Sequence, residues 1–172
     1  GCPDMGDVAI LPQVELTTGK VVRVAFDKGS EVAEPGYYAV TLANGTRCEV
    51  TGTGRCAFYR FTYAQEGDAG LLVNLPFGIG NLPRESWGGV RMREASVADD
   101  GVAGISGTYR RYGWATGRRV GFAICFSRPW KALQREKPDH EGEPPRMLAQ
   151  FDMPTGGELL VKIGLSSRSA EN

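Results

Sequence analysis

Apolar and polar residues alternate along most of this chain. Between residues 120 and 126, Val120, Phe122, Ile124 and Phe126 occupy alternate positions, with small residues between them. A period of two residues is typical of a β-strand with one buried face. Similar short runs end at glycine, asparagine, aspartate or proline; they cover residues 22–27, 37–42, 47–51, 57–63, 71–75 and 159–165.

No stretch shows the 3.6-residue period of a long amphipathic helix. About eight to twelve short strands separated by turn residues predict an all-β fold, a two-sheet antiparallel β-sandwich. The residues between the core positions of 120–126 (Gly121, Ala123 and Cys125) are small and uncharged, which is typical of a sheet covered on both faces. We therefore expect one sheet to present its outer face to another domain. Two ranges rich in proline, glycine or charge, 75–87 and 128–146, are predicted to be long loops.

Length and charge limit the classes of partner. The 172 residues suffice for a single domain, 1–172, with its own core. Lys plus Arg and Asp plus Glu both total 20, and this balance argues against nucleic acid or an anionic membrane as the main partner. There is no apolar run long enough for a membrane span, and no signal peptide is visible. The chain opens directly on a strand and closes on a helix-like start, so we expect a domain truncated at both ends.

Four cysteines, Cys2, Cys48, Cys56 and Cys125, match no zinc-binding spacing. Two alternatives remain for them. Cys48 and Cys125 are expected to be buried thiols. Alternatively, Cys48 and Cys56 face each other in consecutive strands and form a disulfide in an exporting compartment.

Catalytic chemistry has little support among the residues. The only histidine, His140, lies in a charged loop, so no metal site and no Ser-His or Cys-His apparatus is predicted. Glu31 and Glu34 could form the carboxylate pair of a glycoside hydrolase. Their spacing places both in a loop around Pro35-Gly36, however, where burial would not tune a catalytic acid. The paired arginines at 110–111 and 118–119 are expected to be solvated.

Aromatic residues beside glycine offer a second kind of site. Trp87 and Trp114 have the context of side chains that stack on sugar rings, although packing in a core or interface explains most aromatics equally well. The candidate carbohydrate-binding or domain-docking residues are Glu31, Glu34, Tyr37, Trp87 and Trp114. No catalytic residue is assigned, so residue chemistry alone indicates a β-rich binding or support domain.

One stretch carries a family resemblance. The segment Phe26-Asp-Lys-Gly-Ser-Glu-Val-Ala-Glu-Pro-Gly-Tyr-Tyr-Ala-Val40 resembles the Phe-Ser-His-x-x-Glu-x-Ala-x-Pro-Gly-Tyr-Tyr-x-Val pattern of the N-terminal domain of glycoside hydrolase family 92. Residues 1–12, 49–62, 105–127 and 161–166 are similar to further family motifs in the same order, so the likeness covers nearly the whole chain. Asp27, Lys28 and Tyr59 depart from the family's usual Ser, His and His.

The resemblance implies a fold and a parent enzyme. The family comprises calcium-dependent, inverting exo-α-mannosidases, in which a galactose-mutarotase-like supersandwich packs on an (α/α)6 barrel. The barrel supplies the catalytic carboxylates and most of the calcium ligands, so calcium is expected in the parent enzyme and none in this chain. This chain lacks the barrel and is expected to be inactive alone, with the missing helical domain and mannose-containing glycans as partners. A secreted or periplasmic location is implied. A free-standing carbohydrate-binding or structural sandwich is the alternative.

The resemblance also gives the Pro35-Gly36 turn a role. Proline fixes φ, and glycine permits a turn that other residues resist, so the chain enters the following strand at a set angle. We expect Tyr38 to point toward the core. Tyr37 and one of Glu31 or Glu34 would then meet an adjoining domain or its cleft.

Overall fold

The computed structural model describes residues 6–14, 23–77, 87–95, 103–112, 117–138 and 141–168, with the backbone only for 87–95. These residues contain strands and turns and no helix, and so no helix that could cross a membrane. The strands are β1 (Ala9–Gln13), β2 (Phe26–Glu34), β3 (Tyr37–Leu42), β4 (Arg47–Gly52), β5 (Cys56–Tyr63), β6 (Gly67–Asn74), β7 (Trp87–Ala95), β8 (Ala103–Arg111), β9 (Arg118–Phe126), β10 (Ala132–Arg135), β11 (Arg146–Met153) and β12 (Gly157–Ser166).

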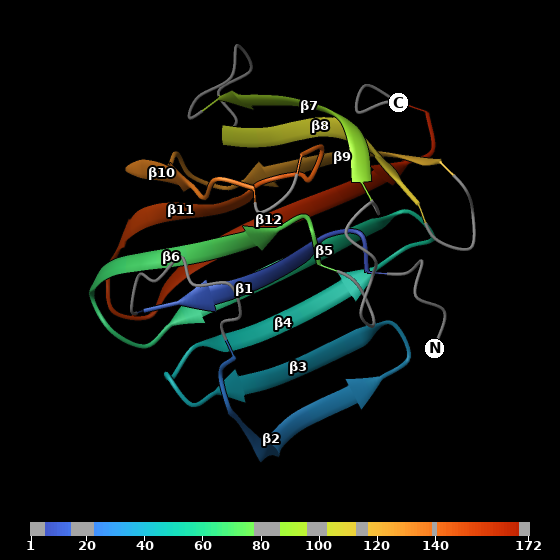
Figure 1. Cartoon of the computed structure of the whole chain (residues 1–172). Coiled ribbons are helices and arrows are strands. Elements are labelled where there is room, and N and C mark those ends of the chain that lie inside the picture. The colour runs from blue at the N-terminus through green and yellow to red at the C-terminus, as the bar shows by residue number, and fades with distance from the viewer. Residues whose placement is uncertain are drawn as a thin grey trace.

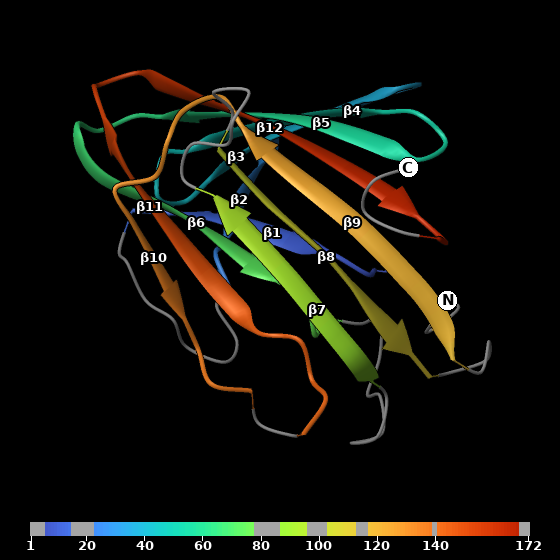
Figure 2. The ribbon, with the colours of Figure 1, turned by 90° about the horizontal axis from the view of Figure 1, so that it is seen from above.

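The strands form two antiparallel sheets, which confirms the predicted β-sandwich. The larger sheet has eight strands in the order β2-β3-β4-β5-β12-β9-β8-β7, and the smaller has four in the order β1-β6-β11-β10. The smaller sheet lies against one face of the larger one (Figure 1, Figure 2). The chain crosses between the sheets several times, so each sheet joins strands that are far apart in the sequence, such as β1 with β6 and β5 with β12.

The core lies between the inner faces of the two sheets. Alternate residues of β5, β12, β9 and β8 point at alternate residues of β6 and β11, as the period-two pattern requires. Phe126 of β9 spans the interface, with its ring centroid 5.7 Å from that of Phe151 in β11 and 5.9 Å from that of Trp130. Burial of such apolar surface is the main term that stabilises the fold.

The smaller sheet leaves one part of the larger sheet uncovered. β2, β3 and β4 extend past β1, and the central core includes only Cys48 from these three strands, as a partly buried neighbour. A groove of about 220 Å³ separates β1 from this overhang, and its lining is mostly apolar. Pro12 of β1 lines the groove, and proline is tolerated there because β1 is an edge strand.

Two loop predictions are wrong in part. β2 extends to Glu34, so Glu31 and Glu34 lie in a strand, and only Pro35 and Gly36 form the turn, with Gly36 at φ 82°. The predicted loop at 128–146 contains the short strand β10. Of the predicted loop at 75–87, residues 78–86 lie outside the described residues.

The cysteine alternatives are corrected as well. Cys48, Cys56 and Cys125 are free thiols, so the proposed Cys48–Cys56 disulfide is wrong. Cys48 is paired with Phe61 on the inner face, whereas Cys56 lies on the opposite, outer face because it is an odd number of positions from Phe61 along β5. Cys125 is exposed rather than buried, and Cys2 lies outside the described residues.

Candidate functional site

The predicted site residues Glu31 and Glu34 lie on a bulged edge strand. Asp27 pairs with Thr41 and Val32 with Ala39, so β2 takes five steps where β3 takes two, and three extra residues form a bulge. Bulges of this kind re-aim side chains and terminate pairing at sheet edges.

Ser30 holds the bulge in place. Its hydroxyl donates to the Asp27 carbonyl oxygen at 2.7 Å and accepts from the Thr41 amide at 2.8 Å. Arg47 of β4 reaches over β3 and donates to the Ser30 carbonyl oxygen at 2.9 Å. The bulge is therefore tied to two neighbouring strands.

Glu31 is engaged from both sides within this bulge. Its carboxylate forms an ion pair with Lys28 and accepts a hydrogen bond from the Tyr38 hydroxyl at 2.8 Å. These bonds, the one from Lys28 first, hold the pKa of Glu31 below its usual value. Glu31 therefore serves as an ionised acceptor.

Tyr37 lies on the outer face and Tyr38 on the inner side, where it lines the groove beside β1. The Tyr37 hydroxyl donates to Glu49 Oε1 at 2.7 Å, and Arg60 donates to both oxygens of the same carboxylate at 2.6 and 2.7 Å. The Arg60 bonds, followed by that of Tyr37, lower the pKa of Glu49 to about 2. Glu49 is thus a fixed anion that orients Tyr37.

Glu34 lies beside a shallow notch at the ends of β3 and β4. Glu34 pairs with Tyr37 across the turn, and both line an open recess of about 310 Å³ together with Thr51 and Thr53. The recess offers a carboxylate, hydroxyl groups and an aromatic residue within one surface. That mixture can bind a sugar or the surface of another domain.

Of the two candidate tryptophans, the structure places only the backbone of Trp87, and it lies far from these residues. Trp87 is the first residue of β7, where its backbone pairs with Arg111, and β7 and β2 are the opposite edges of the eight-stranded sheet. Trp114 and His140 lie outside the described residues. The structure therefore brings Glu34 and Tyr37 together at the outer notch, places Glu31 with Tyr38 on the inner side of the sheet, and separates Trp87 from all of them.

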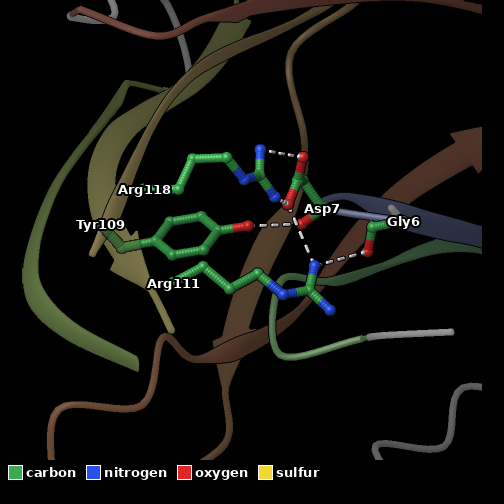
Figure 3. Close-up of polar contacts among 5 residues, drawn as sticks. All are labelled: Gly6, Asp7, Tyr109, Arg111 and Arg118. Atoms are coloured by element: carbon green, nitrogen blue, oxygen red, sulfur yellow. Dashed lines mark hydrogen bonds and ion pairs between the residues drawn. The ribbon is translucent and has the colours of Figure 1, made fainter. Parts of the chain in front are cut away.

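A buried ion cluster that the sequence analysis missed lies at the start of β1 (Figure 3). Asp7 accepts from Arg111 at 3.0 Å through Oδ1, and from Arg118 at 2.5 Å through Oδ1 and 2.9 Å through Oδ2. The side chains of Arg111 and Asp7 are 1% and 9% exposed, and that of Arg118 is 31% exposed. The expectation that both arginine pairs are solvated is therefore wrong for Arg111 and Arg118.

The same cluster binds the backbone that precedes β1. The Tyr109 hydroxyl donates to the Asp7 carbonyl oxygen at 2.6 Å, and Arg111 donates to the Gly6 carbonyl oxygen at 3.3 Å. Burial raises the pKa of the Tyr109 hydroxyl, so it remains a proton donor. Residues 6 and 7 are thus fixed to the adjoining ends of β8 and β9.

The acidic and thiol side chains are not arranged to hold a metal ion in the described part of the chain. The part of the chain that the structure describes contains no group of three or more His, Cys, Asp or Glu residues that could hold an ion. The carboxylates of Glu31, Glu49 and Asp7 are instead occupied by arginine, lysine or tyrosine donors. These residues do not fit a calcium site.

Comparisons with known proteins agree with the fold. A family model described as the glycosyl hydrolase family 92 N-terminal domain matches residues 1–166. No curated protein matches the chain. Among solved structures, the family GH92 α-mannosidase BT3965 from Bacteroides thetaiotaomicron superposes with a TM-score of 0.81 at 24% identity, over 98% of this chain and 25% of its own.

Two further solved structures are similar. The inverting GH92 mannosidase BT2199 from Bacteroides thetaiotaomicron gives a TM-score of 0.75 at 21% identity, over 95% of this chain and 22% of its own. The GH92 glycosyl hydrolase ccman5 gives 0.73 at 19% identity, over 96% and 24%. At these identities the structures show a shared fold, and this chain spans about a quarter of their length. Because the family model covers nearly all of it, the chain belongs to glycosyl hydrolase family 92, as a representative of that family's N-terminal domain.

Proposed function

We propose that this chain is the non-catalytic N-terminal accessory domain of an α-mannosidase that removes terminal α-mannosides with inversion. One observation carries the proposal: the family match covers residues 1–166, while the chain spans only about a quarter of the GH92 mannosidases that it resembles. The remainder of such an enzyme would hold the catalytic machinery. Residues 1–172 would form one domain of it.

The electrostatics of the carboxylates support a non-catalytic role. Inverting hydrolysis needs one carboxylic acid that stays protonated until it donates to the leaving oxygen, and such a group has a raised pKa. Glu31 and Glu49 have the opposite property, because Lys28 and Arg60 lower their pKa values. We therefore assign the proton donor and the calcium ligands to the rest of the parent enzyme. From the family resemblance, we further propose mannose-containing glycans as its substrates and a secreted or periplasmic location.

The β2–β3 corner, formed by residues 34–37, would shape the substrate cleft of that enzyme. Glu34 is exposed beside Tyr37, and Tyr37 is held by the fixed anion Glu49. An oriented phenol ring next to a free-standing carboxylate suits a position where a domain surface or a glycan is contacted. Trp87 would contribute from another part of the domain, because β7 lies at the far edge of the sheet. Trp114 remains a candidate from the sequence alone.

The test compares this chain with the full polypeptide of its gene. The full polypeptide is expected to hydrolyse a nitrophenyl α-mannoside, with the inverted β-anomer as the first product seen by NMR. This chain alone is expected to show no hydrolysis, and no heat of binding with mannose or mannobiose. Hydrolysis by the chain alone, or a full polypeptide without α-mannosidase activity, would refute the proposal.

A second candidate is a free-standing carbohydrate-binding module. The open notch of about 310 Å³ beside Glu34 and Tyr37 is the observation that favours it. In that case titration of this chain with mannobiose would give a binding isotherm, and Tyr37→Ala would abolish it. A flat titration with the unaltered chain would exclude this candidate for mannosides.

A further inference from the structure

Two arginines of the hairpin formed by β8 and β9 lie opposite each other on the outer face of the large sheet. Arg110 of β8 pairs directly with Arg119 of β9. The residues on either side of them along the strands point into the core, so these two side chains point away from it, and both are exposed. Like charges that lie directly opposite in a sheet repel each other and destabilise the pairing. An anion between the two guanidinium groups would remove this repulsion.

Neither guanidinium group is neutralised by a carboxylate in the described part of the chain. Arg110 Nη1 donates to the Gly117 carbonyl oxygen at 3.0 Å, and Arg119 Nη1 donates to the Arg168 carbonyl oxygen at 3.3 Å. On its β7 side Arg110 pairs with Gly88, which has no side chain to offer. The strands β8 and β9 contain no acidic residue. The two positive charges are therefore left to a group from outside.

The two backbone bonds hold the guanidinium groups in place and leave one edge of each unused. Both bonds use Nη1, whereas Nε and Nη2 of Arg110 and Arg119 make no hydrogen bond within the described residues. Nε and Nη2 lie on one edge of the planar group, and such an edge binds an oxyanion through two parallel hydrogen bonds. The acceptor residue Arg168 is itself fixed, because its amide donates to the Ser166 hydroxyl at 3.1 Å. The unused edges are thus held in place before a ligand arrives.

The next pair along the same hairpin shows what opposed arginines can hold. Arg111 pairs with Arg118 on the inner face, and both guanidinium groups donate to the Asp7 carboxylate (Figure 3). The two pairs are adjacent in one continuous register, so their Cα separations differ by only about 1 Å. The inner pair receives its oxyanion from the chain itself, whereas the outer pair faces solvent. An oxyanion from solution would complete the outer pair in the same way.

Charge and the number of donors define the ligand. The outer pair has two positive charges and two unused donor edges, so a dianion with three oxygens satisfies it better than a carboxylate, which has one charge and two oxygens. A phosphate monoester has that charge and those oxygens near neutral pH, because its second pKa is about 6. We propose that Arg110 and Arg119 form a binding site for a phosphate group. The site is separate from the notch beside Tyr37, because four strands lie between β3 and β8.

Isothermal titration of the 172-residue chain with inorganic phosphate and with glucose 6-phosphate, at an ionic strength held constant with sodium chloride, tests the site. The test variants are Arg110→Gln and Arg119→Gln, each of which removes one donor edge. Arg119→Lys keeps the charge and removes only the planar edge. The matched control is Arg128→Gln, which removes the same charge beyond the other end of β9, where Arg128 also donates to a backbone carbonyl oxygen, that of Asp152, at 3.5 Å.

Both phosphate ligands should bind the unaltered chain and Arg128→Gln alike. Arg110→Gln and Arg119→Gln should each weaken binding by about tenfold or more, because each loses two charge-assisted hydrogen bonds. Arg119→Lys should weaken binding as well, since lysine is a point charge without the two parallel donors. The affinity for glucose 6-phosphate should fall as the pH is lowered from about 7.5 to about 5, because the ester loses its second charge.

Thermal unfolding separates loss of binding from loss of the fold. Arg119→Gln removes one of two opposed like charges, so at low salt and without phosphate its Tm should equal or exceed that of the unaltered chain. Added phosphate should raise the Tm of the unaltered chain and of Arg128→Gln, and it should leave the Tm of Arg119→Gln unchanged.

The two ligands also distinguish the sources of the phosphate group. Binding of glucose 6-phosphate at least as tight as that of inorganic phosphate indicates a phosphate carried by a larger molecule, and weaker binding indicates the free ion. Acetate that binds as tightly as phosphate would overturn the assignment to a dianion. Absence of binding by the unaltered chain, or equal affinities in Arg110→Gln, Arg119→Gln and Arg128→Gln, would overturn the site. Because neither ligand is a mannoside, these results do not depend on the proposed function.

Discussion

Replacement of Asp7 by asparagine tests the buried ion cluster directly. The substitution keeps the size of the side chain and removes its charge, so Arg111, only 1% exposed, loses its anionic partner. Loss of one member of a buried pair typically costs about 3–5 kcal/mol, because the remaining charge is left uncompensated. We expect a value of about 3 kcal/mol, since Arg118 is partly exposed and an asparagine oxygen still accepts a hydrogen bond.

This loss of unfolding free energy can be converted into a shift in Tm. For a domain of this size, 1 kcal/mol corresponds to about 2–4 °C in Tm, so Asp7→Asn should lower Tm by about 6–12 °C. Urea denaturation followed by circular dichroism measures the free energy of unfolding, and the m-value should stay unchanged because the same surface is exposed. The matched control is Asp68→Asn, which removes the exposed carboxylate that pairs with Lys131 and should leave the midpoint nearly unchanged.

A double variant separates charge pairing from packing. In an Arg111→Met background, Asp7 has only Arg118 as a charged partner among the groups of Figure 3, so Asp7→Asn should cost less there than in the unaltered chain. Equal cost in both backgrounds would refute the pairing argument. A shift no larger than that of Asp68→Asn would refute the claim that the cluster stabilises the fold.

Three further predictions concern other parts of the sandwich. Arg60 lowers the pKa of Glu49 to about 2, so the ionised Glu49 stabilises the fold above the unfolded pKa near 4.5, and this stabilisation is lost as the pH falls from about 4.5 toward 2. In an acid titration, a Glu49→Gln variant should therefore lose less stability over that range than the unaltered chain. Burial raises the pKa of Cys48 to about 12, so iodoacetamide at pH 8 should label the exposed Cys56 and spare Cys48. Mass spectrometry measures the labelling of each cysteine, and equal labelling would contradict the burial of Cys48. A β-carbon on Gly157 would lie 2.7 Å from the carbonyl oxygen three residues earlier, so Gly157→Ala should lower Tm measurably, and an unchanged Tm would show that the turn relaxes without cost.

Alternation of residue type was enough to predict the central strands. In β5 and β12, and in β9 from Phe122 onward, burial follows the period of two in the sequence. The predicted runs at β3, β4 and β6 are also strands, although their burial does not alternate. β2 was missed beyond its first residues because the bulge interrupts the alternation and places glycine, serine and charged residues inside the strand. β10 has only four residues, too few for a pattern to emerge.

The buried arginine shows a different limit. In β8, residues 103, 105, 107, 109 and 111 are all buried, so the alternation that predicts Tyr109 inside also puts Arg111 inside. That position could have been read from the sequence. Its partner could not, because Asp7 lies 104 residues away and the pairing depends on how β1 is placed against β8 and β9.

Strand register in the large sheet fixes the distance along the strands between the notch beside Tyr37 and the Asp7 cluster. Tyr37 lies level across the sheet with Gly104 of β8, through the pairs of Thr51, Phe58, Lys162 and Cys125. Arg111 is seven residues farther along β8, which corresponds to about 23 Å at the usual rise per residue. The notch beside Glu34 and Tyr37 is therefore set back along the strands from the Asp7 cluster. Because of this offset, Asp7→Asn acts at a distance from the notch, and its effect on stability should not depend on Tyr37.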